Sequence, residues 1–334
     1  MESPIELSLV IPLYDEAEVV PLLVERVTAA LRPIPGRCEV LFVDDGSEDG
    51  TAAAIRRAVA AADHGGDGTR LRISILTLSR NFGHQAAITA GLRAASGACV
   101  VVMDGDLEDP PELIQELYAA WKEGNPVVVA QRTGRRETLW RRLQFAAFHR
   151  VVALLADIPP TANVGVFGLM DRRVAAEIAA LPERARFLTG LRAWVGWKPA
   201  IVRYQRQARA GGRSKQSLGR LYRMAFDSIF GFSHKPLRLS WLLGLVVSAS
   251  SFAYAMILLA LRLAGINVVR GFTTTAVAIL FLGGVQLLMI GILGEYLGRI
   301  YDEVKSRPPY IVKEIWTSEG GAASAEHGAG AHPR

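Results

Sequence analysis

The chain has 334 residues and a formal net charge of +6; half of its residues are hydrophobic, and its mean hydropathy is +0.23. This length suits one large α/β domain with an appendage, and so apolar a composition is uncommon in a purely soluble enzyme. The apolar excess lies between about Leu237 and Ile300, and basic residues crowd just before it, from Arg203 to Arg238. Basic residues beside a hydrophobic span favour anionic lipid or phosphorylated substrates as partners, and we expect no nucleic-acid partner.

The two cysteines, Cys38 and Cys99, each lie at the edge of an apolar run that is typical of a strand. We expect both to be buried and reduced, because neither has the spacing of a metal site or of a disulfide framework. The N-terminal sequence MESPIELSLVIP is acidic and lacks the basic and apolar regions of a secretory signal. We therefore expect the first domain to stay in the cytosol.

The first part of the chain alternates apolar runs of strand length with stretches whose apolar residues recur at helical spacing. This alternation predicts an α/β fold with a mostly parallel sheet that helices cover on both faces. Ligands of such sheets bind beyond the carboxyl ends of the strands. We expect strands at 7–12, 39–43, 71–78, 98–103 and 126–130, and helices at 17–31, 49–62, 85–95 and from Pro110-Pro111 onward.

Two apolar stretches, Leu237–Leu263 and Thr273–Leu293, are each long enough to cross a hydrocarbon core of about 30 Å as a helix. The alternative is a buried hairpin of a soluble protein, where apolar stretches this long are uncommon. Basic residues flank the pair and few lie between, so the positive-inside rule predicts a multi-pass inner (plasma) membrane protein with both termini cytoplasmic. We expect an α/β domain at 1–212, an amphipathic interfacial helix region at 213–236, a two-helix transmembrane domain at 237–300, and a cytoplasmic tail at 301–334 that is disordered from about 318.

Asp104-Gly105-Asp106 follows the fourth expected strand in the sequence VVVMDGDLEDPPE. Two carboxylates one residue apart can hold a hard divalent cation, Mg²⁺ or Mn²⁺, and leave coordination positions for water and for the diphosphate of a nucleotide-sugar. Glu108 offers a third oxygen donor nearby. The alternative is a solvated acidic turn in which Asp109 caps the next helix. The position after a strand of an α/β sheet favours the metal site.

A second acidic cluster, Asp44-Asp45-Gly46-Ser47, follows the second expected strand. Carboxylates at a strand end can accept hydrogen bonds from a base or from ribose hydroxyls, as they do in dinucleotide sites. The alternative is a turn in which Ser47 or Asp49 caps the next helix. Both interpretations place these side chains at the sheet edge where the Asp104 cluster is expected.

Two more polar segments follow the first and third expected strands. The first segment runs from Pro12 to Glu16. Its Tyr14 could stack on or flank a base, whereas its Glu16 also fits the first turn of a helix, where acids are favoured. The other, 79–85 (SRNFGHQ), could contact a nucleotide or shape the sheet edge, and a lone histidine such as His84 is more often structural.

Basic side chains that could bind a phosphate occur in two places: Arg132 follows the fifth expected strand, and a run of arginine and lysine extends from Arg203 to Lys215. Arginine binds phosphate through two parallel hydrogen bonds, and lysine offers a mobile point charge. One interpretation is a phosphate clamp at the membrane surface; the alternative is a topology signal with attraction to anionic lipid. Gly211-Gly212 within the run indicates a mobile loop that could close over a substrate.

Five segments in this order, IPLYDEAE, FVDDGSEDGT, LSRNFGHQAAITAGL, MDGDLEDPPE and RQARAGGRSK, resemble the family-2 glycosyltransferases. Within that family they resemble the polyprenyl-phosphate branch of dolichyl-phosphate mannose synthases and bacterial bactoprenol glucosyltransferases. The resemblance covers roughly residues 5–305 and implies a GT-A fold, Rossmann-like, followed by two membrane helices. It also implies a nucleotide-sugar donor, UDP-linked in the bacterial branch, a polyprenyl (undecaprenyl) phosphate acceptor and a homotetramer.

The resemblance implies a role for each residue that matches a family motif. For the nucleotide-sugar these are Pro12, Tyr14, Glu16, Asp44, Asp45, Ser47 and Asp104; for the metal Asp104, Asp106 and Glu108; for catalysis Asp104, Asp106 and Arg132; and for the lipid phosphate or diphosphate Arg132, Arg206, Arg209 and Lys215.

This chain departs from the family pattern in two places. Glu108 stands where family members usually carry Gln, which puts the metal preference in doubt. Val166 and Gly168 replace an Asp and an Arg of a GDFRLMDR-like stretch, and that Asp is a candidate for a catalytic or acceptor-side role. Its loss need not abolish the reaction, because a lipid phosphate is ionised at neutral pH and needs no general base to attack the anomeric carbon.

We expect a single in-line displacement with inversion, in which a divalent cation stabilises the leaving nucleoside diphosphate. Two alternatives remain open. Val166 favours a catalytically inactive membrane adaptor with a degenerate nucleotide-binding domain, against which the intact acidic and basic clusters speak. A processive polysaccharide synthase usually carries a QxxRW motif and more membrane helices, and this sequence has neither.

Overall fold

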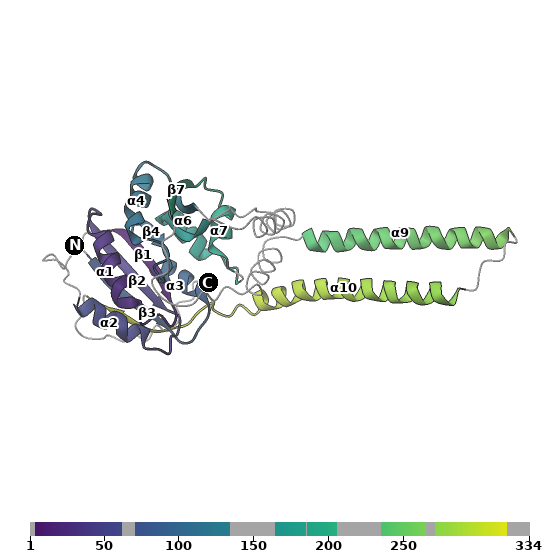
Figure 1. The fold of residues 1–334 in the computed structure, drawn as a ribbon, viewed down its shortest axis with the longest axis horizontal. Coiled ribbons are helices and arrows are strands. Elements are labelled where there is room, and N and C mark those ends of the chain that lie inside the picture. The colour runs from purple at the N-terminus through teal and green to yellow at the C-terminus, as the bar shows by residue number, and fades with distance from the viewer. Residues whose placement is uncertain are drawn as a thin grey trace. The chain divides into compact units, whose positions relative to one another are not determined.

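The computed structural model describes residues 4–61, 71–133, 164–184, 186–205, 235–264 and 271–318. The chain divides into two compact units. Figure 1 shows the elements of both as a ribbon. The first unit comprises residues 1–139, 160–216 and 307–334, and the second comprises 140–159 and 217–306.

The first unit is built on a sheet that has eight strands in the described part of the chain, in the order β7-β5-β6-β4-β1-β2-β3-β8. The predicted mostly parallel sheet is confirmed for β1 to β5, because β1 pairs in parallel with β2 and β4, β2 with β3, and β5 with β7. Two strands, β6 and β8, run antiparallel to their neighbours. The strands are β1 (Ile5–Leu13), β2 (Arg37–Asp44), β3 (Leu71–Leu78), β4 (Cys99–Val102), β5 (Val127–Thr133), β6 (Val164–Asp171), β7 (Ala200–Gln205) and β8 (Val312–Thr317).

Helices pack on both faces of this sheet. Alternate side chains of β1 point to opposite faces: Leu9 and Ile11 join the core beneath α1, α2 and α4, while Val10 lies against Gly91 of α3. The helices of this unit are α1 (Val20–Leu31), α2 (Thr51–Ala61), α3 (His84–Ala94), the short 3-10 helix η1 (Pro111–Leu113), α4 (Ile114–Lys122), α6 (Arg172–Ala180) and α7 (Leu188–Trp194).

The structure adds three strands that the sequence did not predict. β6 and β7 complete the sheet beyond β4, and β8 lies in the stretch that was expected to be tail. β8 pairs antiparallel with β3, and hydrogen bonds from Ser79 N–H to the Ile311 carbonyl (2.9 Å) and from Ser318 N–H to the Ile73 carbonyl (2.9 Å) extend the pairing at both ends. The chain that leaves the second unit therefore forms an edge of the first unit's sheet.

The second unit contains two long helices, α9 (Lys235–Leu263) and α10 (Phe272–Val304). Among the described residues, α10 alone is long and apolar enough to cross a membrane, over Val277–Val304 with a mean hydropathy of 2.3, whereas the apolar part of α9, Ser240–Tyr254, is shorter. A second membrane crossing therefore stays a prediction. The interfacial helix region expected at 213–236 falls almost entirely outside the described residues.

Both cysteines are buried and unpaired, as predicted. Cys38 lies in β2 and Cys99 in β4, and both belong to the apolar core beneath α1, α2 and α4. The structure therefore assigns them to packing.

Candidate active site

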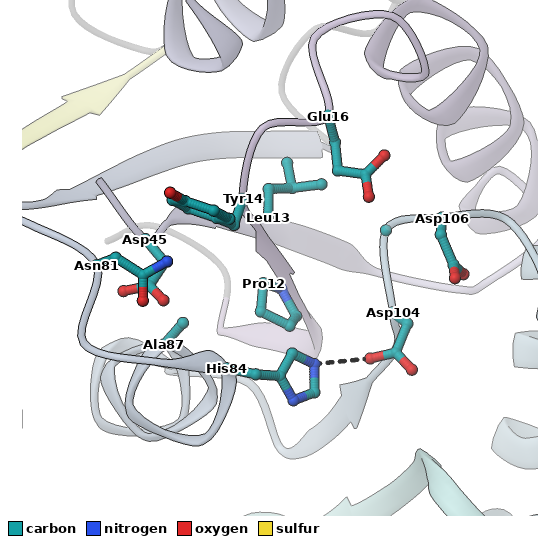
Figure 2. Close-up of a pocket in the computed structure, with 11 residues that line it drawn as sticks. Pro12, Leu13, Tyr14, Glu16, Asp45, Asn81, His84, Ala87, Asp104 and Asp106 are labelled. Carbon is teal, nitrogen blue, oxygen red and sulfur yellow. Dashed lines mark hydrogen bonds and ion pairs between the residues drawn. The ribbon is translucent and has the colours of Figure 1, made fainter. Parts of the chain in front are cut away.

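A cavity of about 330 Å³ opens beyond the carboxyl ends of the parallel strands (Figure 2). Its walls come from the segment after β1, the end of β2, the start of α3 and the segment after β4, as predicted for ligands of such a sheet. It is lined by Pro12, Leu13, Tyr14, Glu16, Asp45, Asn81, His84, Ala87, Asp104, Gly105 and Asp106. Of the predicted site residues in the described part, six line it, and Asp44, Ser47, Glu108 and Arg132 do not.

The loops after β1 and β2 are locked together by hydrogen bonds. Asp15 N–H donates to Ser47 Oγ (3.0 Å) and Glu16 N–H to Thr51 Oγ1 (3.1 Å). In the other direction, Glu48 N–H donates to Asp15 Oδ1 (3.0 Å). Ser47, predicted as a nucleotide ligand, is thus used to hold the loop that carries Tyr14.

The two aspartates at the end of β2 are buried, with 2% and 3% of their surface exposed, and both accept backbone hydrogen bonds. Asp44 Oδ1 accepts from Ser47 N–H (3.0 Å), and Asp45 accepts from Phe82 N–H (2.7 Å) and Gly83 N–H (2.8 Å) through its two oxygens. Burial raises the pKa of both carboxyls, although these hydrogen bonds act in the opposite direction. Asp45 lines the cavity, but its oxygens fix the loop that begins α3.

Asp104 and Asp106 follow β4 and both line the cavity. Figure 2 shows the carboxylate of Asp104 facing the imidazole of His84, with 2.9 Å between Oδ1 and Nε2. Removal from water lowers the pKa of His84, but the hydrogen bond to Asp104 and the charges of Asp104, Asp45 and Asp106 outweigh it and raise that pKa. Asp106 Oδ1 accepts a hydrogen bond from Glu108 N–H (3.1 Å), whereas the Glu108 side chain does not line the cavity.

The donor set fits a divalent cation that binds together with a diphosphate. Among the described residues, no three His, Cys, Asp or Glu side chains lie close enough to hold a metal ion by themselves. Mg²⁺, however, is usually bound by one or two carboxylates together with substrate phosphates and water. Asp104 and Asp106 supply two such carboxylates in one cavity. Glu108 as a third ligand stays a prediction.

Arg132 belongs to a cluster beside the cavity. Its Nη2 lies 3.1 Å from Asp109 Oδ2, its Nε donates to the Tyr204 hydroxyl (3.0 Å), and that hydroxyl donates to Asp109. Asp109 is 1% exposed, and burial raises its pKa while Arg132 and Tyr204 oppose the rise. The sequence predicted Arg132 but missed Tyr204, and it considered Asp109 only as a helix cap. The other predicted cations, Arg206, Arg209 and Lys215, lie outside the described residues.

Arg192 explains the unusual sequence of β6. This α7 side chain is 4% exposed, and its guanidinium donates to the carbonyls of Val166 (3.2 Å) and Gly165. A Cβ atom at Gly168 would lie 2.7 Å from Arg192 Nη1, so no larger residue fits there without a shift. Burial lowers the pKa of Arg192 to about 10. Gly168 therefore leaves the space that the Arg192 guanidinium occupies beside β6.

A carboxylate-lined cavity at the carboxyl edge of a mostly parallel sheet is typical of an α/β nucleotide-binding enzyme. Residues 8–178 match the family described as glycosyl transferase family 2, and residues 235–300 match the GtrB C-terminal hairpin. The chain therefore belongs to glycosyl transferase family 2; it is a glycosyltransferase, and its fold is of the GT-A type that the resemblance implied.

The relatives cover nearly the whole chain. An uncharacterised glycosyltransferase of Synechocystis sp. is 42% identical over 94% of this chain and 97% of its own length. The uncharacterised glycosyltransferase YkcC of Bacillus subtilis is 40% identical over 96% and 97%. A bactoprenol glucosyl transferase derived from the SfII prophage of Shigella flexneri is 39% identical over 92% and 98%. The similarity thus includes both the α/β unit and the long helices.

Proposed function

We propose that the chain transfers one sugar from a nucleotide-sugar, with a UDP-sugar favoured, to polyprenyl phosphate, such as undecaprenyl phosphate. The observation that carries the proposal is the shared cavity: Tyr14 offers an aromatic face for a base, and Asp104 and Asp106 offer oxygen ligands where a diphosphate and its cation can bind. The cavity volume of about 330 Å³ falls in the range of small-molecule sites. The Shigella relative is named a bactoprenol glucosyl transferase, which supports the lipid acceptor.

The reaction is a single displacement at the anomeric carbon. An acceptor phosphate oxygen forms the new bond to that carbon, the bond to the donor diphosphate breaks, and its electron pair leaves with the nucleoside diphosphate, so the configuration inverts. Mg²⁺ or Mn²⁺ held by Asp104 and Asp106 would neutralise charge on the leaving group. The acceptor phosphate needs no general base, which is consistent with Val166 at the position of the family Asp.

The cationic residues have separate places in this proposal. Arg132 is held by Asp109 and Tyr204 at the end of β5, next to the segment after β4, where it adds positive charge beside the donor site. Arg206, Arg209 and Lys215 are proposed to bind the acceptor phosphate by the family pattern. Because these three residues lie outside the described part of the chain, sugar-transfer assays are the test of their role.

We propose that the reaction takes place at the cytoplasmic face of the inner (plasma) membrane. The apolar helix α10, the match to the GtrB hairpin and the basic residues around both apolar stretches support a membrane hairpin with cytoplasmic termini. A homotetramer belongs to the same proposal, and Gly283, Gly284 and Gly291 of α10 would permit close helix contacts.

The experiment is transfer of radiolabelled sugar from a panel of UDP- and GDP-sugars to undecaprenyl phosphate, in membranes that contain the full chain. Each donor is tested with Mg²⁺, with Mn²⁺ and with EDTA. We expect a lipid-extractable product from one donor, lost with EDTA and in Asp106→Asn but retained in Glu177→Gln, a change of an exposed carboxylate on α6. No product from any donor, while UDP still binds, would reject the proposal in favour of an inactive adaptor.

A further inference from the structure

A chain of hydrogen bonds links α7 to Asp104. Leu188 N–H, at the start of α7, donates to Gln85 Oε1 (2.8 Å), and Gln85 Nε2 lies 3.4 Å from His84 Nδ1. His84 Nε2 lies 2.9 Å from Asp104 Oδ1. His84 and Asp104 line the donor cavity. The sequence offered the segment 79–85 as a nucleotide contact or as part of the sheet edge and favoured a structural role for His84, and none of the roles in the proposed function uses His84 or Gln85.

The chemistry of these groups fixes the direction of every hydrogen bond. A backbone N–H can only donate, so the oxygen of the Gln85 amide faces Leu188 and its NH₂ group faces His84. Nδ1 of His84 then accepts, which leaves the ring proton on Nε2, where it is donated to Asp104. An N–H donor at Nε2 orients the Asp104 carboxylate through Oδ1 and leaves its other oxygen open to a ligand.

We propose that His84 and Gln85 are positioning residues for the sugar transfer. Gln85 sets the tautomer of His84, and His84 holds Asp104 Oδ1 so that Oδ2 is left for the divalent cation. The inference rests on the proposed function, because it assigns Asp104 to a cation that binds with the donor diphosphate. Hydrogen-bond partners of metal ligands orient them, and their loss typically weakens metal binding by about 10- to 100-fold.

The test measures Mn²⁺ binding to the full chain in detergent with saturating UDP, from the electron paramagnetic resonance signal of free Mn²⁺. His84→Ala removes the donor, and His84→Gln restores an N–H of similar reach. Gln85→Met keeps the length of Gln85 but removes its amide. The matched control is Gln115→Met on α4, whose amide donates to the Ala30 carbonyl (3.4 Å) away from the cavity.

We expect the Mn²⁺ Kd to rise about 10- to 100-fold in His84→Ala and several-fold in Gln85→Met, while His84→Gln and the Gln115 control stay within about threefold of the wild type. Sugar transfer by His84→Ala should recover at saturating Mn²⁺, because positioning changes the affinity for the cation. Thermal unfolding midpoints identify any variant that has lost its fold.

Three results would overturn the inference: wild-type Mn²⁺ binding in His84→Ala or in Gln85→Met, a His84→Gln variant as weak as His84→Ala, or loss of binding in His84→Ala as complete as in Asp106→Asn. The last result would make His84 a direct ligand. Mn²⁺ binding with UDP needs no lipid acceptor. A wild type that binds both but transfers no sugar would therefore reject the proposed function and leave this inference to be judged on its own result.

Discussion

Gly46, in the turn after β2, is a position where one added methyl group should lower the rate of sugar transfer far more than the same change at nearby Gly50. Its φ is +71°, and a Cβ atom there would lie 2.4 Å from the backbone carbonyl carbon of Arg80 and 2.8 Å from the backbone nitrogen of Asn81. Gly50, in the same loop, has a φ of +84° and nothing within 4 Å of its Cβ position. Alanine at either position has the same unfavourable φ, which costs about 1 kcal/mol, but only Gly46→Ala also meets backbone.

The magnitude follows from these distances. An ordinary contact begins at 3.4 Å, so the 2.4 Å approach at Gly46 requires a backbone shift of about 1 Å in the segment that carries Asn81 and leads to His84. Both side chains line the donor cavity. A misplacement of about 1 Å can cost about 100-fold in rate. We therefore expect kcat/KM for sugar transfer to fall about 100-fold in Gly46→Ala and less than about threefold in Gly50→Ala.

The assay is sugar transfer by both variants at a fixed donor concentration series, with thermal unfolding of the full chain in detergent as the stability measurement. Both variants should unfold at a lower temperature than the wild type, and Gly46→Ala should also bind UDP more weakly. Equal transfer rates in the two variants would refute the reasoning, because they would show that the contact with Arg80 is relieved without moving the cavity wall.

Three further changes test contacts within the first unit, each by thermal unfolding of the full chain. Arg132→Met leaves the Asp109 carboxylate buried without its cation and should lower the free energy of unfolding by about 3 kcal/mol at pH 7; burial already raises the pKa of Asp109, so the loss should shrink as the pH is lowered toward 4 and the carboxyl is protonated. Trp316→Ala removes a β8 side chain that packs against the core and should cost about 2 kcal/mol. Glu6→Gln breaks the ion pair with Lys122, whose hydrogen bond lowers the pKa of Glu6. The wild type should therefore be more stable than this variant by about 0.5–1 kcal/mol at pH 7, and it should lose that advantage as the pH falls below about 4. A pH-independent loss in Arg132→Met, an unchanged midpoint in Trp316→Ala, or a Glu6→Gln difference that persists in acid would each contradict its prediction.

The part of the fold that could be predicted is the part that local pattern determines. Residues 71–78 form a strand with the predicted bounds, and strands β1 to β5 all lie where apolar runs alternate with helical spacing. Parallel strands bring their carboxyl ends to one edge. The convergence of Tyr14, Asp45, Asp104 and Asp106 on one cavity was therefore predictable without any knowledge of contacts.

The strands that were missed depend on partners far away in the sequence. β8 pairs with β3 across a long stretch of sequence, and the two hydroxyls in contact, those of Ser74 and Thr317, lie 243 residues apart. No local pattern distinguishes that short run from a solvated tail. The same limit applies to the cluster of Asp109, Arg132 and Tyr204, where the hydroxyl and the carboxyl it serves lie 95 residues apart.

Burial divides the acidic residues of the active-site edge into two groups that the sequence cannot separate. Asp44, Asp45 and Asp109 are almost fully buried, and their oxygens accept hydrogen bonds that fix the turn after β2, the start of α3 and Arg132. Asp104 and Asp106 are only half-buried in the same cavity wall, so water and ligands can reach them. The motifs predict Asp44 and Asp45 as ligands just as they do Asp104 and Asp106, because a motif records the residue type and spacing but not which oxygens the fold already uses. We therefore expect a cation that bridges to the donor diphosphate to bind at Asp104 and Asp106, and a change at Asp45 to act on the reaction through the loop that leads to His84.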